Sequence, residues 1–183
     1  MRINVHAGHN PDGKIACGAV GLIKESTEAR KVKKEVIKLL RKKGHTVYDC
    51  TCQNGKSQTD VLKCIVAKCN QHKVDLDISI HFNSGATDKK GDGKTTGTEV
   101  WVYSPASAAK TPAERVVKAI SALGFRNRGV KTRKDLYVLR RTNSPAMLIE
   151  CCFVDDKDDV TLYNAKKMAA AIAAGILADA EKK

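Results

Sequence analysis

The chain has 183 residues, of which 42% are hydrophobic and 29% are charged, and its formal net charge is +13. This length is enough for one ordinary domain with its own hydrophobic core. No stretch approaches the roughly 18 consecutive apolar residues of a transmembrane helix, so we expect no membrane insertion. The alternating run directly after Arg2 predicts a strand rather than a secretory signal peptide, which indicates synthesis in a cytoplasm.

The excess of positive charge indicates an anionic partner, which is a nucleic acid, an anionic lipid or an anionic polymer such as a cell wall. Aromatic residues make up only 4% of the chain, which argues against a protein that stacks single-stranded bases on aromatic rings. The seven cysteines have no regular spacing. They predict reduced thiols rather than a disulfide framework or a zinc knuckle.

Apolar periodicity and turn residues predict strands that alternate with helices along the chain. The predicted strands are residues 2–6, 45–50, 75–81, 98–103, 136–139 and 146–150. The predicted helices are residues 25–43, which end at Gly44, and three that begin at a capping box over 57–60, at a second one over 111–114 and at the acidic run 155–159.

This alternation predicts an α/β fold, in which one domain over residues 1–183 contains a mostly parallel, twisted sheet of about six strands flanked by helices. The polar segment 83–97 is expected to be an exposed loop. The acidic residues of 155–159 are expected to pair with the N-terminal dipole of the last helix, and the Lys182–Lys183 end is expected to fray.

Four side chains are candidates for a site at one edge of this sheet, because ligand sites in open α/β sheets collect at the carboxyl ends of strands. His9 follows the first predicted strand, and His81 ends the third. Glu25 opens the first helix, and Glu150 ends an apolar run that is typical of a strand buried on both faces. A carboxylate in that position costs free energy unless it is paired, bound to a metal or used in catalysis.

The direction of Glu25 follows from helix geometry. At 100° per residue, the apolar stripe of helix 25–43 is centred within about 20° of Glu25, whereas Glu28 lies about 75° away. Glu25 is therefore expected to point at the protein body, where it needs a partner. The helix dipole and a bound cation are both candidate partners.

Two histidines and one carboxylate are a common catalytic zinc set that leaves a position open for water. His9, Glu25 and His81 fit this set, and Glu150 would then be a general base. Simpler roles stay open for each residue, such as a turn cap, a strand-end histidine or a salt bridge. His6 is a competing ligand, or a residue that orients His9 or the metal's water.

Five motifs occur in order over nearly the whole chain. They are Val5–Asn10, Gly21–Glu25, Ile78–Asn83, Leu136–Leu139, and Pro145–Glu150 with Phe153 after it. Together they resemble the zinc-dependent N-acetylmuramoyl-L-alanine amidases (amidase type 3 family), in the branch found in bacterial autolysins and phage endolysins. The chain departs from the family pattern at His6, where much of the family has an acidic residue, and at Ala7, which replaces a proline.

By this resemblance, His9, Glu25 and His81 would bind Zn²⁺, and Glu150 would be the catalytic carboxylate. The implied reaction cleaves the amide between the lactyl group of N-acetylmuramic acid and the first L-alanine of the stem peptide, so peptidoglycan is the implied partner. The resemblance also implies the catalytic domain of a phage or prophage endolysin, made in the host cytoplasm and released to the wall through a holin. We expect a monomer without a wall-binding module.

A basic run just upstream of Glu150 is expected to steer the protein toward an anionic wall. Its members are Arg126, Arg128, Lys131, Arg133, Lys134, Arg140 and Arg141. Two other interpretations are a nucleic-acid-binding α/β protein, which predicts salt-sensitive binding to DNA or RNA, and a noncatalytic wall-binding module. Of these three interpretations, the amidase is the one we predict, with no nucleic-acid partner.

Overall fold

The structure is a computed structural model that describes residues 1–178. The strands are β1 (Arg2–Ala7), β2 (Thr46–Asp49), β3 (Leu76–Asn83), β4 (Thr98–Val102), β5 (Asn127–Thr132) and β6 (Ala146–Phe153). The helices are α1 (Glu25–Lys42), α2 (Gln58–Asn70), α3 (Lys110–Ser121), α4 (Tyr137–Arg141), α5 (Lys157–Leu162) and α6 (Ala165–Leu177). The expected Lys182–Lys183 end lies outside the described residues.

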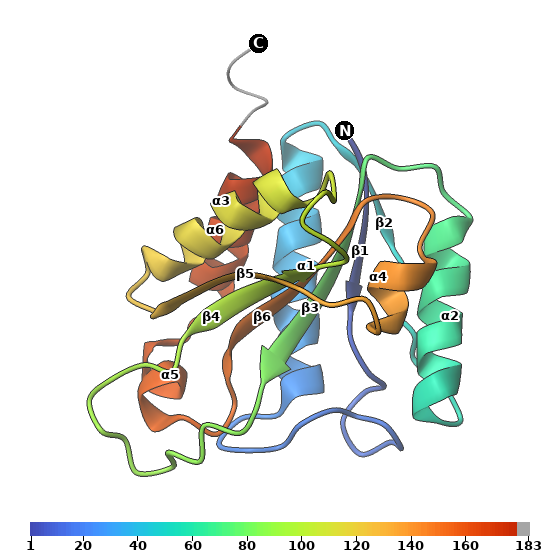
Figure 1. Cartoon of the computed structure of the whole chain (residues 1–183). Helices are drawn as coiled ribbons and strands as arrows, with labels where there is room; N and C mark the ends of the chain where they lie inside the picture. The colour runs from blue at the N-terminus through green and yellow to red at the C-terminus, as the bar shows by residue number, and fades with distance from the viewer. Residues whose placement is uncertain (179–183) are drawn as a thin grey trace.

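The six strands form one sheet in the order β2-β1-β3-β6-β4-β5. The strands β2, β1, β3 and β6 are mutually parallel, whereas β4 runs antiparallel to β6 and carries β5 parallel to itself. The predicted α/β fold with a mostly parallel sheet is therefore confirmed. Because β4 is reversed, it begins at the edge of the sheet where β3 and β6 end, at the bottom of Figure 1.

Helices cover both faces of the sheet. On one face, α1 packs on β1, β2 and β3, α3 packs on β4 and β5, and α6 lies against both helices. The other face carries α2 and α4 (Figure 1). Two hydrophobic clusters fill these layers, and the larger one contains Ile78, Ile80 and Ile149. Each of these three side chains is fully buried. The central strands are therefore held by packing in the same cluster as the apolar residues of α1.

The other face of β3 carries buried polar residues, as the alternation in 75–81 predicts. Asp77 and Ser79 are buried under α2 rather than exposed to solvent. Asn4 of β1 donates from Nδ2 to Asp77 Oδ1 at 2.7 Å and to the Cys69 carbonyl oxygen at 2.9 Å. Such pairing offsets the free-energy cost of burying polar groups.

The strand predicted over Leu136–Leu139 is wrong, because this segment lies in and next to the short helix α4. A four-residue apolar run fits a buried turn of helix as well as a strand. Here Val138 and Leu139 both pack into the smaller hydrophobic cluster, which also contains residues of α2. The fifth strand lies earlier, at Asn127–Thr132. It is an edge strand whose residues are half-buried or exposed, so it shows no apolar alternation.

Two predicted helices also differ from the structure, one in its start and the other in its continuity. The helix expected from 111–114 begins at Lys110, after Ala109, and has no side-chain cap. The single last helix is two helices, α5 and α6, which are separated at Asn164. Asn164 Oδ1 accepts from the amides of Lys166 and Lys167, which makes it the N-cap of α6.

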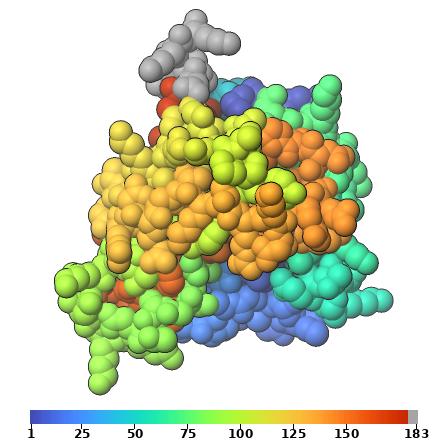
Figure 2. Space-filling view, viewed as in Figure 1, coloured from blue at the N-terminus to red at the C-terminus, as the bar shows by residue number. Residues whose placement is uncertain are grey.

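The acidic residues before and in α5 bind the backbone of segment 83–97. This segment forms the light green corner at the lower left of Figure 2. Asp155 accepts from the amides of Gly85 and Thr87, and Asp158 accepts from those of Asp92 and Gly93. Asp156 caps α5, and Asp158 and Asp159 lie in its first turn, so the expected pairing with the helix dipole is present beside these backbone contacts. None of the helices within residues 1–178 is long and apolar enough to cross a membrane.

Candidate metal centre and catalytic carboxylate

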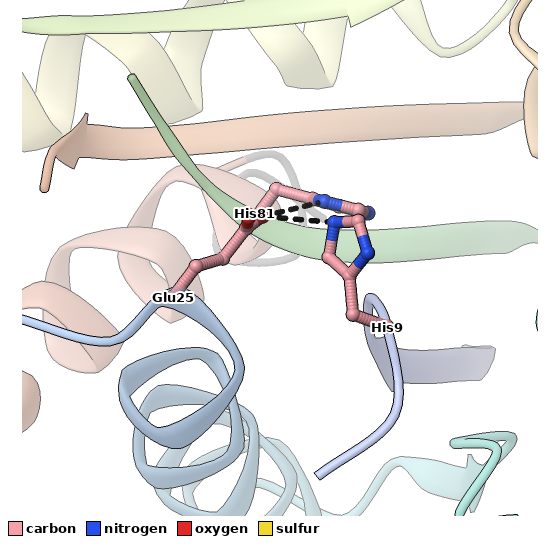
Figure 3. Close-up of side chains that lie close together, drawn as sticks. All are labelled: His9, Glu25 and His81. Carbon is pink, nitrogen blue, oxygen red and sulfur yellow. Dashed lines mark hydrogen bonds and ion pairs between the residues drawn. The ribbon is translucent and has the colours of Figure 1, made fainter. Parts of the chain in front are cut away.

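His9 in the loop after β1, Glu25 at the start of α1 and His81 near the end of β3 meet at the carboxyl edge of the sheet. Their candidate ligand atoms all lie within 4.8 Å of one another. Glu25 Oε1 accepts a hydrogen bond from His81 Nδ1 at 2.9 Å and lies 3.2 Å from His9 Nε2. Figure 3 shows both imidazole rings turned toward this carboxylate. The structure therefore brings together the three residues that the sequence singles out as a zinc set.

Glu25 is the first residue of α1 and points inward, as its position on the helix predicts. It is only 4% exposed, whereas Glu28 lies at the margin and contacts Lys31 and Tyr163. Burial raises the pKa of Glu25, but hydrogen bonds from His81 and His9 outweigh burial and hold this pKa well below its usual range. Glu25 is therefore an anion in the folded protein.

Backbone amides complete the surroundings of Glu25. The Ala19 amide donates to Oε2 at 2.8 Å, and the Phe82 amide donates to Oε1 at 3.2 Å. The loop before α1 thus fixes one carboxylate oxygen and the end of β3 fixes the other. Hydrogen bonds to a carboxylate favour its charged form, so these amides act in the same direction as the histidines.

Two glycines let the backbone approach the cluster closely. A Cβ atom on Gly18 would lie 2.5 Å from Glu25 Oε2, and one on Gly8 would lie 2.0 Å from the His81 ring atom Cε1. His9 has a φ of 63°, in the left-handed region that non-glycine residues rarely adopt. Such backbone strain persists only where neighbouring groups hold it.

Arg30 is one of the groups that hold the His9 segment, and no local sequence pattern marks it for this role. Its Nη2 donates to the carbonyl oxygens of His9 at 2.9 Å and Cys52 at 3.0 Å. Its Nη1 donates to the carbonyl oxygens of Gly8 and Asn10, both at 3.4 Å. One guanidinium thus joins α1 to the loop that carries His9.

The donor set fits a zinc ion. Two imidazoles and a carboxylate are a known catalytic zinc set that leaves a coordination position open. His9 Nδ1 is buried and has no hydrogen-bond partner among the described residues, so no second group competes to fix the orientation of this ring. Among residues 1–178, the cluster therefore offers three protein ligands and no fourth.

Glu150 lies on β6 directly beside His81, its register partner on β3. Its Oε2 atom is buried and has no hydrogen-bond partner within residues 1–178. Burial, together with the negative charges of Glu25 and Glu99, raises the pKa of Glu150 well above its usual range. Glu150 is therefore a carboxyl group next to the cluster whose surroundings favour its protonated form.

Glu99 is a fifth carboxyl-edge residue that the sequence reasoning missed. It is 2% exposed and is the register partner of Glu150 on the other side of β6. Arg128 Nε and Lys131 Nζ lie 2.7 and 2.6 Å from Glu99 Oε2, and these two cations lower its pKa against the opposing effect of burial. The only available signal was a glutamate inside the predicted strand 98–103, and nothing in the sequence showed that this strand is reversed.

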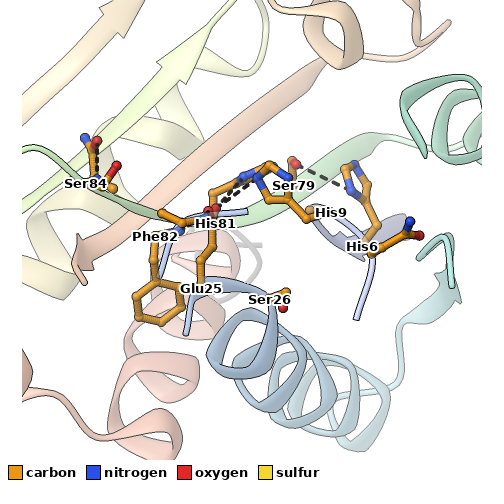
Figure 4. Close-up of polar contacts among 12 residues, drawn as sticks. His6, His9, Glu25, Ser26, Ser79, His81, Phe82 and Ser84 are labelled. Carbon is orange, nitrogen blue, oxygen red and sulfur yellow. Dashed lines mark hydrogen bonds and ion pairs between the residues drawn. The ribbon is translucent and has the colours of Figure 1, made fainter. Parts of the chain in front are cut away.

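His6 does not join the cluster. It is 1% exposed, and its Nδ1 lies 3.4 Å from Ser79 Oγ (Figure 4). Burial lowers the pKa of His6 to about 3, so its ring is neutral. His6 therefore contacts β3 and is not one of the three candidate ligands.

Comparison with known proteins gives a consistent result. The family model described as N-acetylmuramoyl-L-alanine amidase (Amidase_3) matches residues 3–181. An uncharacterized protein of Clostridium perfringens is 40% identical over 91% of this chain and 48% of its own length. The endolysin of Bacillus phage SPP1 is 31% identical over 85% of this chain and 56% of its own length. The chain thus spans about half the length of these curated relatives.

Two solved structures share the fold. The catalytic domain of the CD27L endolysin, described as targeting Clostridia Difficile, superposes with a TM-score of 0.85 at 28% identity, over 97% of each chain. The catalytic domain of CwlV, an N-acetylmuramoyl-L-alanine amidase of Bacillus (Paenibacillus) polymyxa var. colistinus, superposes with a TM-score of 0.77 at 26% identity, over the full length of both.

Proposed function

Because the chain belongs to the N-acetylmuramoyl-L-alanine amidase family, we propose that it hydrolyses the amide between N-acetylmuramic acid and the L-alanine of the stem peptide, and so lyses bacterial cell walls. Residues 1–183 would be the catalytic domain. The observation that carries the proposal is the buried, unpaired oxygen of Glu150 beside the cluster of His9, Glu25 and His81.

His9, Glu25 and His81 would hold Zn²⁺ through His9 Nε2, a Glu25 carboxylate oxygen and His81 Nδ1. When bound, zinc polarises the amide carbonyl and lowers the pKa of water. The family membership and the donor set support this assignment. The lowered pKa of Glu25 favours its negative charge, which suits a ligand for a cation.

Glu150 would move the proton. Its ionised form accepts a proton from the attacking water, and its neutral form then donates that proton to the departing L-alanine nitrogen. The raised pKa of Glu150 suits the second step, because an environment that favours the protonated carboxyl group lets it act as an acid. Its free oxygen suits the first, because no protein donor competes for it.

Peptidoglycan would be the partner and the bacterial cell wall the site of action. All seven cysteines are free thiols, which supports synthesis in a reducing cytoplasm before release to the wall. The net charge of +13 complements an anionic wall.

The test is product analysis on purified walls. We expect the walls to clear with release of new L-alanine amino termini, EDTA to stop the reaction, and Zn²⁺ to restore it. New reducing ends would instead identify a glycosidase. Salt-sensitive DNA binding without wall clearing would favour the nucleic-acid interpretation, and wall binding without any product would favour a noncatalytic module.

A further inference from the structure

A basic groove runs along one flank of α1, where buried and exposed residues of the helix meet. It has a volume of about 720 Å³ between α1 and the segment that follows β2. Its lining residues are Arg30, Lys33, Lys34, Ile37, Lys38, Arg41, Asp49 and Gln53. We call this feature the α1 groove. Five of these eight side chains are cations and only one is an anion.

The single carboxylate of the α1 groove is already neutralised. Asp49 Oδ2 lies 2.6 Å from Lys33 Nζ, and Lys33 is the one buried lysine of the set. Lys34 and Lys38 are exposed, and within residues 1–178 neither forms an ion pair. The remaining cations of the groove therefore keep their charge uncompensated by protein carboxylates.

The two arginines of the groove are held in place by uncharged acceptors. Arg41 donates from Nε and Nη2 to the Val47 carbonyl oxygen at 3.2 and 2.6 Å, and Arg30 binds backbone carbonyl oxygens only. These contacts fix the guanidinium groups without cancelling their charge. A concave surface lined with fixed charge of one sign concentrates a counter-ion.

The helix dipole does not account for this charge. Cations stabilise a helix at its last turn, which applies to Arg41 but not to Lys34 or Lys38 in the middle of α1. Lys34, Lys38 and Arg41 have the spacing i, i+4, i+7, which places them on one stripe about 10 Å long. Such a stripe matches a linear chain with repeated negative charges better than a single carboxylate.

We propose that the α1 groove binds a linear, phosphate-rich polymer of the bacterial cell wall and so holds the enzyme on its substrate. The proposal rests on the proposed function, because the wall supplies the anion. A polymer in the groove would lie next to Arg30, which binds the His9 carbonyl oxygen at 2.9 Å. The groove contains no aromatic side chain, so it lacks the stacking platform of a single-strand nucleic-acid site.

The test is a binding measurement on catalytically silenced protein. The full chain carrying Glu150→Gln is sedimented with walls before and after their phosphodiester-linked polymers are removed with hydrofluoric acid. We expect stripped walls to bind about tenfold more weakly. Adding Lys34→Gln and Lys38→Gln should weaken binding to intact walls about tenfold, because two exposed ion pairs between these lysines and polymer phosphates are lost. The slope of log binding constant against log salt concentration should fall by about two. Binding to stripped walls should not change.

The matched control is Lys166→Gln with Lys167→Gln, which removes the same charge from two exposed residues at the start of α6. It should bind like the parent protein. Equal weakening by the two double variants would overturn the proposal, because net charge alone would then explain binding. Undiminished binding of the parent protein to stripped walls would also overturn the proposal. So would weaker binding of the Lys34→Gln, Lys38→Gln variant to duplex DNA with unchanged binding to walls.

Wall digestion by the chain with Glu150 intact is measured separately, and thermal unfolding verifies that each variant folds. A chain that binds phosphate polymer through the groove but releases no L-alanine termini would refute the proposed function and leave the groove assigned. A chain that digests walls equally well with and without the two groove lysines, and binds them equally well, would refute the groove alone.

Discussion

Glu25 and Glu150 are two carboxylates at the same edge of the sheet, and their surroundings are opposite. Both oxygens of Glu25 accept hydrogen bonds, from two backbone amides and from His81, and His9 lies close by. Glu150 has a buried oxygen with no partner among the described residues, and its charged neighbours include Glu25 and Glu99. The pKa of Glu25 is lowered, whereas that of Glu150 is raised.

This difference assigns the two residues to different tasks. Ample donors keep a carboxylate ionised, which suits a group that holds a cation. Burial beside other carboxylates favours the neutral form, which suits a group that carries a proton. Pairs of titratable groups whose environments push their pKa values apart commonly divide acid–base roles in this way, and variants can test each half separately.

The largest effect is expected for Glu25→Gln. The amide removes the negative charge between two imidazoles, so we expect loss of stoichiometric zinc and of wall digestion to background. Metal analysis after dialysis and release of L-alanine termini would measure both. The control is Glu28→Gln on the same helix, since Glu28 contacts Lys31 and Tyr163 rather than the cluster. Full zinc retention in Glu25→Gln would remove Glu25 from the ligand set.

Glu150→Gln should separate chemistry from metal binding. The amide keeps the size of the side chain but cannot exchange a proton, so we expect a fall in kcat of about 10²–10⁴-fold. Zinc content should be unchanged, because Glu150 is not in the cluster of candidate ligands. Unaltered turnover in a variant that retains its metal would show that another group moves the proton.

The sequence predicts the position of Glu25 among the candidate metal ligands better than it predicts the surroundings of Glu150. Helix periodicity alone directs Glu25 inward, and the ends of the predicted strands bring His9 and His81 to one edge. The pKa of Glu150 is raised by burial, then by Glu25 and Glu99, and Glu99 reaches Glu150 through the antiparallel pairing of β4 with β6. Strand direction and pairing partners are tertiary features, and no local pattern in 98–103 encodes them.

Segments with weak apolar patterns were also beyond local prediction. Strand β5 is basic and lies at the sheet edge, so burial leaves little periodicity in it. The run 136–139 is too short to distinguish helix from strand. The Arg30 contacts to the His9 segment join residues 21 positions apart through backbone carbonyls, which carry no sequence signal at all.

Gly18→Ala should disturb Glu25 without touching its charge. A Cβ there would lie 2.5 Å from Glu25 Oε2, which the Ala19 amide holds in place. We expect zinc affinity to fall about 10–100-fold, the range typical when groups that orient a ligand are lost. Competition with a chelator would measure it. Gly13→Ala is the matched control, since Gly13 has nearly the same φ, 80° against 81°, with nothing within 4 Å.

Both glycine variants carry the strain of a left-handed alanine, about 1–2 kcal/mol, so thermal unfolding should move to lower temperature in both, and further in Gly18→Ala, where the Cβ atom also meets Glu25 Oε2. Zinc affinity should fall only in Gly18→Ala. An equal loss of affinity in both would show that loop strain, rather than displacement of the Glu25 carboxylate, controls the metal centre.

The smallest effect, a shift in pH dependence, is expected for Glu99→Gln. The charge of Glu99 raises the pKa of Glu150, and the two cations that Glu99 now binds would lose their carboxylate partner after its removal. Both changes favour ionised Glu150 and lower its pKa. Because a general base acts in its ionised form, kcat/KM rises with pH through this pKa, so its acid limb should move to lower pH by up to about one unit. A limb that stays in place, or moves to higher pH, would show that Glu99 does not act on Glu150 through its charge.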